Sequence, residues 1–221
     1  MAYILCIETS TTNCSVAIAK DHQIVAVKED YSNQYSHAER LHLFIEDVIA
    51  TASISINALD AIAVSKGPGS YTGLRIGVSA AKGLAYALNI PMISIPTLTS
   101  LAKQVQANEG YIVPMLDARR MEVYSAVFSG VSYEEVRTTK AEILTTDSFV
   151  SFLEEENQVV FIGNGVAKFK DICTASNATF ICDKLPSARE MCQLAYDKYK
   201  AKDFEDIAYF EPYYLKDFVT G

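Results

Sequence analysis

The 221-residue chain has few of the residues from which metal sites and nucleophilic sites are usually built. It contains three histidines, and its five cysteines form no C-x-x-C pair, so we expect no zinc site. His37 and His42 are five residues apart, about 140° around a helix, which is too far to share a metal ion. No G-x-S-x-G occurs, so a serine hydrolase has no support. The odd cysteine count indicates free thiols in a reducing cytoplasm.

Basic charge and long apolar runs are also scarce. The 19 Lys and Arg against 27 Asp and Glu give a net charge of -8, which argues against a protein that binds nucleic acid by itself. A role beside a basic partner stays open. The most apolar stretch, residues 76–95, contains Lys82 and Pro91, so we expect no membrane contact. The opening MAYILCIETS has no basic region and continues into a strand-like run, so we expect no secretory signal.

The predicted secondary structure passes twice through the same order of elements, βββαβαβα. Apolar residues alternate in the expected strands and recur at helical spacing in the expected helices. Ser36 and Glu39 have the spacing of a capping box at the start of the first helix. In the first half we expect strands at 3–8, 14–19, 23–29, 60–65 and 91–95, and helices at 37–53, 71–88 and 96–106. In the second half we expect strands at 111–116, 120–128, 133–144, 159–162 and 179–182, and helices at 147–155, 166–172 and 187–201.

The boundary between the two halves lies at Asn108-Glu109-Gly110. We therefore expect an α/β fold with domains at 1–108 and 109–221, each a mixed sheet with helices on its faces. No residue-level repeat is present, so the predicted duplication is one of topology. The tail, residues 203–221, is rich in Tyr and Phe, and we expect part of it to pack onto the fold.

The most distinctive segment is GPGSYTGLRIG, residues 67–77. A glycine-rich turn before a helix can bind an anion with its backbone N–H groups, although this pattern is neither a dinucleotide-binding motif nor a Walker A motif. The alternative is close packing, because small residues recur every four positions along one helix face. These residues are Gly69, Gly73, Gly77, Ala81 and Ala85. Another backbone, from the same domain or from a partner, can approach such a face closely.

Acidic and hydroxyl side chains gather where the first strand of each half ends. Glu8 is followed by Thr9, Ser10 and Thr11, and Asp117 occupies the equivalent place in the second half. Carboxylates and hydroxyls at two matching strand ends could hold a hydrated Mg²⁺ ion and nucleotide phosphates. The alternative is that these residues only cap turns. A remnant nucleotide cleft would comprise Glu8, Ser10, Thr11, Gly67, Gly69, Ser70 and Asp117.

Five segments, in order over nearly the whole chain, resemble the bacterial TsaB (YeaZ) family. They are ILCIETSTTNCSVAI, GPGSYTGLRIG followed by AAKGLA, IPTLTSLA, LDARRMEVY and EPYYL. The resemblance implies the acetate/sugar kinase–Hsp70–actin (ASKHA) fold, a duplicated ribonuclease-H-like fold with two βββαβαβα halves. This agrees with the topology predicted from the residues.

The resemblance also implies a role without catalysis. Members of this family resemble degenerate paralogues of TsaD, which with TsaE transfers a threonylcarbamoyl group to the tRNA adenosine beside the anticodon (t6A). TsaD carries an HxxxH metal pair, whereas the corresponding residues 94–101 here, SIPTLTSL, contain no histidine. We therefore expect a cytoplasmic, non-catalytic scaffold or activator with no metal, no cofactor and no catalytic residues. The alternative is an ATP-dependent small-molecule kinase, for which Gly163-Asn164-Gly165 is the only candidate adenosine loop.

The resemblance places the partner interface on the first two helices of the N-terminal half. It implies TsaD as the main partner, TsaE as a second partner, a homodimer when the chain is alone, and tRNA contact only through the complex. The predicted interface residues are His37, Leu41, Phe44, Tyr71, Thr72, Gly73, Leu74, Arg75, Gly77, Val78 and Ala81.

Overall fold

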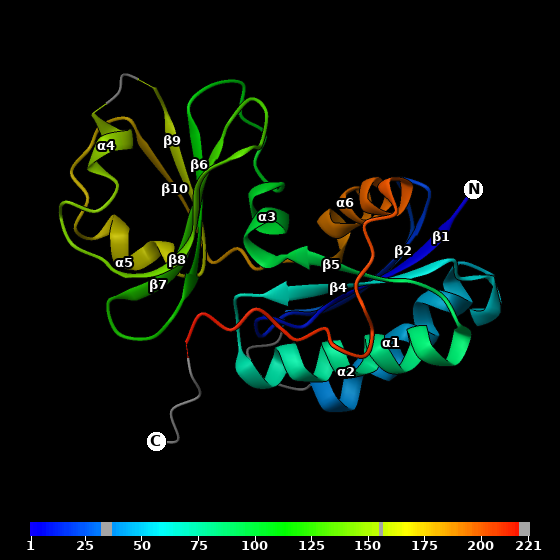
Figure 1. Ribbon diagram of the computed structural model, residues 1–221. Helices are drawn as coiled ribbons and strands as arrows, with labels where there is room; N and C mark the ends of the chain where they lie inside the picture. The colour runs from blue at the N-terminus through cyan, green and yellow to red at the C-terminus, as the bar shows by residue number, and fades with distance from the viewer. Residues whose placement is uncertain (32–36, 155–156, 217–221) are drawn as a thin grey trace. The chain divides into compact units, whose positions relative to one another are not determined.

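The computed structural model describes residues 1–31, 37–154 and 157–216, and the chain divides into two compact units (Figure 1). The first unit comprises Met1–Ser100 and Pro186–Tyr214, and the second comprises Leu101–Leu185 and Leu215–Gly221. Within the described ranges, no helix is both long enough and apolar enough to cross a membrane. Ser36 of the predicted capping box lies outside the described residues.

The first unit contains a five-stranded mixed sheet in the order β3-β2-β1-β4-β5. Its strands are β1 (Tyr3–Glu8), β2 (Cys14–Lys20), β3 (Gln23–Asp30), β4 (Ala61–Gly67) and β5 (Met92–Pro96). The first three strands pair antiparallel, whereas β4 and β5 extend the sheet in parallel. The mixed sheet predicted for the first half is therefore confirmed.

Helices cover both faces of this sheet (Figure 1). They are α1 (His37–Thr51), α2 (Tyr71–Leu88) and α6 (Ala188–Ala201), with a 3-10 turn η1 (Ile56–Ala58) before β4 and α3 (Thr97–Ala102) after β5. Leu5 and Ile7 of β1 belong to the core under α1 and α2, whereas Ile4 and Cys6 belong to the core under α6. Because both faces are buried, β1 reads as a continuous apolar run rather than as an alternating one.

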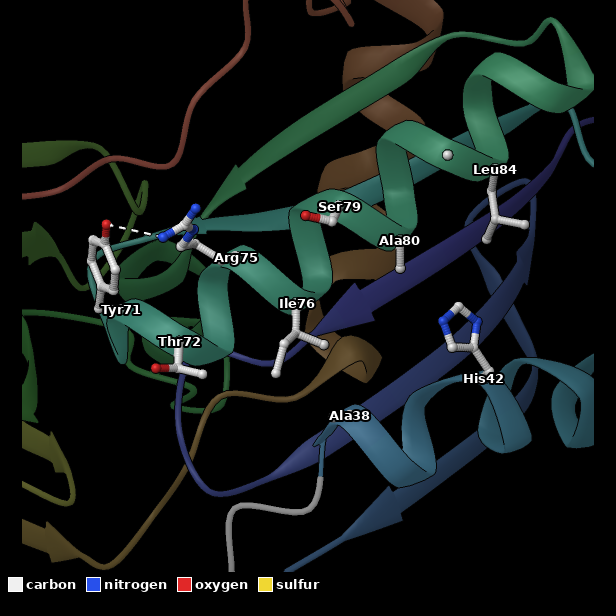
Figure 2. Close-up of a pocket in the computed structure, with 10 residues that line it drawn as sticks. Ala38, His42, Tyr71, Thr72, Arg75, Ile76, Ser79, Ala80 and Leu84 are labelled. Carbon is white, nitrogen blue, oxygen red and sulfur yellow. Dashed lines mark hydrogen bonds between the residues drawn. The ribbon is translucent and has the colours of Figure 1, made fainter.

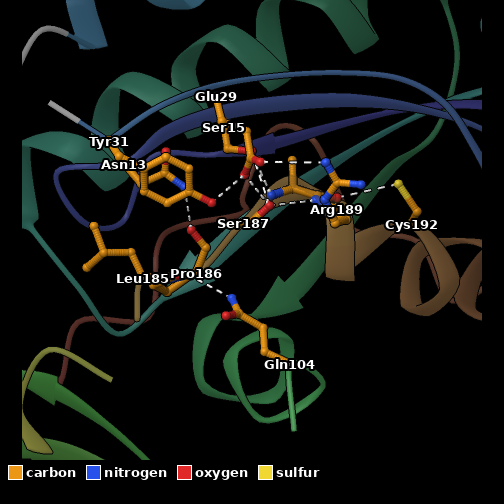
Figure 3. A network of polar contacts seen from close by, with 11 residues as sticks. Asn13, Ser15, Glu29, Tyr31, Gln104, Leu185, Pro186, Ser187, Arg189 and Cys192 are labelled. Carbon is orange, nitrogen blue, oxygen red and sulfur yellow. Dashed lines mark hydrogen bonds and ion pairs between the residues drawn. The ribbon is translucent and has the colours of Figure 1, made fainter. Parts of the chain in front are cut away.

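A buried polar network fixes the start of α6 on the first sheet (Figure 3). The Asn13 side-chain amide donates to the Pro186 carbonyl at 2.9 Å, and the Ala188 N–H donates to Ser15 Oγ at 2.9 Å. Ser187, the N-cap of α6, donates to Glu29 on β3 at 2.5 Å. These bonds connect the helix to β2, β3 and the turn before β2, so they determine which sheet α6 covers.

The position of α6 differs from the division expected at residue 108, which assigned this helix to the second half. The structure groups residues 186–214 with the first unit instead. Ala188, Met191 and Ala195 form an apolar stripe, and these buried side chains pack with Ile4 and Cys6. An apolar stripe of this kind could pack on either of the two sheets. Helical spacing alone therefore does not predict which sheet the helix covers.

The second unit repeats the topology of the first, with the order β10-β9-β6-β7-β8. Its elements are β6 (Tyr111–Asp117), β7 (Glu122–Ser129), β8 (Glu135–Ile143), α4 (Val150–Leu153), β9 (Val159–Gly163), α5 (Val166–Lys170) and β10 (Ala178–Cys182). Phe149, Phe161 and Phe169 lie with ring centroids 4.9–5.5 Å apart in its core. Numbered from the first strand of each unit, the two strand orders are the same, which confirms the predicted duplicated ribonuclease-H-like α/β fold.

The predicted helix over 147–155 is shorter in the structure. Phe149 has a left-handed backbone conformation, with φ of 63°, so α4 begins only at Val150. The ring of Phe149 is buried against Phe161 and Phe169, and this packing holds the residue in a conformation that its side chain disfavours.

Candidate functional site

The inner face of α2 rests on the turn between β1 and β2. A Cβ atom at Gly73 would collide with the Thr9 carbonyl oxygen, and one at Gly77 would collide with Thr9 Oγ1. A Cβ atom at Gly69 would lie 2.5 Å from the Ser10 carbonyl oxygen. Thr9 Oγ1 donates to the Gly73 carbonyl at 2.8 Å, which fixes this close approach. The predicted close packing of the small helix face is therefore confirmed, and the backbone that approaches it belongs to the same unit.

Most of the residues that the sequence predicted for the partner interface are buried, so fewer of them can form such a surface. Tyr71 is half-buried, and Thr72 and Arg75 are exposed. The other eight predicted interface residues are buried inside the first unit, namely His37, Leu41, Phe44, Gly73, Leu74, Gly77, Val78 and Ala81. They support the two helices from beneath, and the exposed side chains of these helices lie elsewhere.

His37 is one of the buried residues predicted for the interface, and its contacts lie within the first unit. Its Nε2 donates to the Thr11 carbonyl at 2.6 Å, which fixes the first turn of α1 to the segment after β1. Burial lowers the pKa of the imidazole, more than its hydrogen bond to Thr11 and the charge of Asp30 raise it. The ring is therefore held in its neutral form, and its role is structural.

A groove of about 710 Å³ lies between α1 and α2 on the outside of the first unit. Figure 2 shows Ala38 and His42 contributed by α1, with the remaining lining residues on α2. From α2 these are Tyr71, Thr72, Arg75, Ile76, Ser79, Ala80, Gly83 and Leu84. The sequence predicted Tyr71, Thr72 and Arg75, and missed the others. The repeat at 72, 76, 80 and 84 was the signal that could have identified this second face.

Gly83 differs from the other glycines of α2. A Cβ atom at this position would meet nothing within 4 Å beyond the helix's own backbone. Glycine inside a helix costs about 1 kcal/mol relative to alanine, so this residue is unfavourable for the isolated fold. The packing of the unit does not explain it, whereas close approach by a second molecule would.

The C-terminal tail packs beside one end of the groove. Tyr214 lies with its ring centroid 4.9 Å from that of Tyr71, and Arg75 donates to the Tyr71 hydroxyl at 3.3 Å. Lys82 on α2 donates to the carbonyls of Ala208 and Phe210 at 3.3 and 3.1 Å. The tail thereby holds Tyr71, and with it Arg75, in place at the end of the groove.

The structure brings together six of the seven residues predicted for a remnant nucleotide cleft. Glu8, Ser10, Thr11, Gly67, Gly69 and Ser70 all lie around the β1–β2 turn and the start of α2 in the first unit. Asp117 lies in the second unit, where its carboxylate accepts from the Arg119 N–H at 2.6 Å and from Lys168 at 2.7 Å. Ser70 caps α2 by accepting from the Gly73 N–H at 3.3 Å, so its hydroxyl has a role within the unit.

Glu8 is fully buried, and one of its carboxylate oxygens accepts from the Ser10 N–H at 2.7 Å. Burial raises the pKa of this carboxyl group more than its hydrogen bond from the Ser10 backbone N–H lowers it. The other oxygen, Oε2, and the Ser10 hydroxyl have no hydrogen-bond partner among the described residues. No cluster of three or more His, Cys, Asp or Glu side chains suited to a metal ion occurs in the described part of the chain.

The glycines of the candidate adenosine loop are explained by packing in the second unit. Gly163 has φ of 129°, and a Cβ atom there would collide with the Met115 carbonyl. A Cβ atom at Gly165 would lie 2.9 Å from Val123 Cγ1. Asn164 between them accepts from the Asp117 N–H at 3.0 Å, so all three residues have roles within the unit.

Comparisons with known proteins agree with the resemblance seen in the sequence. The family model described as TsaD, tRNA N6-adenosine threonylcarbamoyltransferase, matches residues 31–220. The tRNA threonylcarbamoyladenosine biosynthesis protein TsaB of Haemophilus influenzae is 32% identical, over 98% of this chain and 94% of that one. A solved structure of YeaZ from Pseudomonas aeruginosa has a TM-score of 0.83 at 25% identity, covering 97% of this chain and 100% of that one.

A more distant neighbour shows a likeness of fold alone. The (R)-2-hydroxyglutaryl-CoA dehydratase component A of Acidaminococcus fermentans has a TM-score of 0.51 at 10% identity, covering 92% of this chain and 100% of that one. The match to the H. influenzae protein extends over nearly the full length of both chains. By this sequence match, by its fold and by the TsaD family model, the chain belongs to the TsaB (YeaZ) family.

Proposed function

We propose that the chain acts in tRNA threonylcarbamoyladenosine biosynthesis as a non-catalytic subunit that binds and activates TsaD, with TsaE as a further partner. The groove between α1 and α2 is the observation that carries this proposal. Its small and apolar lining residues, Ile76, Ala80, Gly83 and Leu84, admit a helix at short distance. Its polar residues, among them Arg75 and His42, can bond to a partner's polar groups.

A partner of the same fold would suit such a groove. The TsaD family model matches this chain over residues 31–220, which include both groove helices. TsaD would therefore present an equivalent pair of helices, and two helix pairs could pack together as a bundle. In the absence of TsaD, a second copy of this chain offers the same surface, which is why we expect a homodimer when the chain is alone.

The segment without histidines supports a non-catalytic role. Ser94 donates to Glu205 at 2.5 Å, Thr97 shares a 2.7 Å hydrogen bond with Ser65, and Ser100 donates to the Thr97 carbonyl at 2.9 Å. Three of the four hydroxyls at 94–101 are thus bonded within the fold, and the segment contains no histidine, cysteine or carboxylate that could bind a metal. The kinase alternative gains no support from Gly163 and Gly165, which packing explains. We expect the chain to act in the cytoplasm and to meet tRNA only through the complex.

The test is to mix the full chain with TsaD of the same organism and to measure complex formation by size-exclusion chromatography with light scattering. Gly83→Leu fills the groove without a clash inside the unit, because nothing lies within 4 Å of an added Cβ. We expect it to weaken binding to TsaD roughly 10- to 100-fold while the melting temperature is kept. Ala87→Leu, exposed on the same helix but outside the groove, is the matched control and should bind like the wild type.

Three results would contradict the proposal. Equal binding by the Gly83→Leu variant and the control would place the interface elsewhere. Equal TsaD activity with and without the chain would remove the activating role. Modification of tRNA by the purified chain alone would show that it is itself a catalyst.

A further inference from the structure

The turn between β6 and β7 in the second unit holds two consecutive arginines in an unfavourable backbone conformation. Arg119 has φ of 70° and Arg120 has φ of 50°. The turn is tight, because the Glu122 N–H donates to the Arg119 carbonyl at 3.1 Å and the Ala118 N–H donates to the Glu122 carbonyl at 3.1 Å. Glycine, asparagine and aspartate are the residues that such positions favour. The turn itself therefore gives no reason for arginine at either position.

The two side chains are exposed and available. Neither guanidinium group has a hydrogen bond or an ion pair with any described residue, although the backbone N–H of Arg119 donates to Asp117 at 2.6 Å. Strain that the fold does not need is typical of residues kept for binding. In the sequence, this segment, LDARRMEVY, is distinctive only by its resemblance to the TsaB (YeaZ) family.

The surrounding charges leave the positive charge of the two arginines uncancelled. The nearby carboxylates are already paired, Asp117 with Lys168 at 2.7 Å and Glu122 with Lys216. We call these groups and the two arginines the hairpin cluster, which comprises Asp117, Arg119, Arg120, Glu122, Lys168 and Lys216. Four positive charges less two negative charges give the cluster a net charge of +2, in a chain whose net charge is -8. The cluster is thus a local basic site on an acidic protein.

We propose that the hairpin cluster contacts the phosphate backbone of tRNA in the assembled complex. This inference rests on the proposed function and adds to it a surface that faces the RNA. Guanidinium groups bind phosphate oxygens with two parallel hydrogen bonds, which lysine cannot do. An exposed turn has no walls to enclose a small ligand, so an extended polyanion fits it better than a free nucleotide. Elsewhere the acidic chain repels RNA, so this site would orient the tRNA on the complex.

The test measures tRNA affinity of the complete complex with TsaD and TsaE as a function of salt concentration. In the variant R119N/R120G, both residues suit a left-handed turn, and both charges are lost. We expect this variant to weaken tRNA binding roughly tenfold at low salt and to lower the slope of log K against log salt by about 2. Its melting temperature should be equal to that of the wild type or higher, because the backbone strain is relieved. The variant R119K/R120K should keep the slope and lose only part of the affinity.

The matched control removes two charges and one strained residue in the first unit. Lys202 ends α6 with φ of 56°, and Lys200 is exposed on the same helix. The variant K200Q/K202G should therefore keep both the tRNA affinity and the salt slope of the wild type. An equal loss of tRNA binding in this control would show a general charge effect and would overturn the proposal.

The remaining outcomes separate this proposal from the proposed function. Unchanged tRNA affinity and slope in R119N/R120G would overturn the hairpin proposal, while TsaD binding and activation would still stand. If the complex binds a nucleotide and R119N/R120G abolishes that binding while tRNA binding stays intact, the arginines belong to a nucleotide site, and this would also overturn the hairpin proposal. A lowered melting temperature with lost binding would indicate a structural role instead. Failure of the wild-type chain to pair with TsaD would contradict the proposed function and this inference together.

Discussion

On the inner face of α2, a side chain at Gly73 or Gly77 would collide with Thr9, whereas on its outer face a side chain at Gly83 would meet nothing within 4 Å. The same helix therefore carries glycine for two different reasons. Inside, the absence of a side chain lets the helix backbone contact the β1–β2 turn. Outside, it leaves the groove between α1 and α2 open. A pattern of small residues on a helix thus indicates that another backbone can approach it closely. Only the structure shows whether that backbone belongs to the same unit.

The largest expected effect on stability comes from a substitution on the inner face of α2. Gly77→Leu would drive a branched side chain into Thr9, which is held in place by its 2.8 Å hydrogen bond to the Gly73 carbonyl. We expect a loss of about 3 kcal/mol or more of unfolding free energy, because neither the helix nor the turn can move away without breaking packing. Urea unfolding measures this loss. A variant as stable as the wild type would show that the β1–β2 turn yields easily and would remove the contrast between the two faces.

A second prediction concerns the pH dependence of the inner layer. The pKa of His37 is lower in the folded chain than in the unfolded chain, mainly because the ring is buried. The unfolded state therefore binds more protons, and the free energy of unfolding should fall as the pH decreases from about 6.5, the unfolded value, toward the lower folded value. His37→Gln removes the titrating group and should flatten this part of the stability curve. Unfolding at a series of pH values between 5 and 8 measures the slope.

His22→Gln is the control for this experiment, because His22 is exposed in the turn between β2 and β3. This variant should keep the pH slope of the wild type. The same slope in the His37→Gln variant would instead contradict the neutral, structural role given to His37.

The contrast between the two faces also explains what could be predicted from the sequence. Apolar periodicity located α1 and α2, and their apolar residues Leu41, Phe44 and Val78 are all buried. The same periodicity cannot separate a stripe buried within the unit from one buried by a partner, because both remove apolar surface from water. The prediction therefore combined buried residues with exposed ones such as Thr72 and Arg75.

Other features depended on contacts between distant parts of the chain. The polar network of Asn13, Ser15 and Ser187 joins residues more than 170 positions apart, and no local sequence pattern predicts it. The positive φ angles of Arg119 and Arg120 could not be predicted either, because arginine is not a residue type typical of that conformation. By contrast, the order of strands and helices along the chain followed from local apolar patterns, so the mixed-sheet fold was predictable where the site was not.

The smallest expected effect on stability concerns Gly83 on the outer face of α2. Gly83→Ala adds one methyl group where nothing lies within 4 Å and removes the cost of glycine inside a helix, so the free energy of unfolding should rise by about 0.5–1 kcal/mol. The same change at Gly73 would force a Cβ atom onto the Thr9 carbonyl and should lower stability instead. Urea unfolding of the two variants measures opposite signs for one substitution on one helix. If Gly83→Ala destabilised the chain, the groove would be internal packing space and would no longer support binding of a partner.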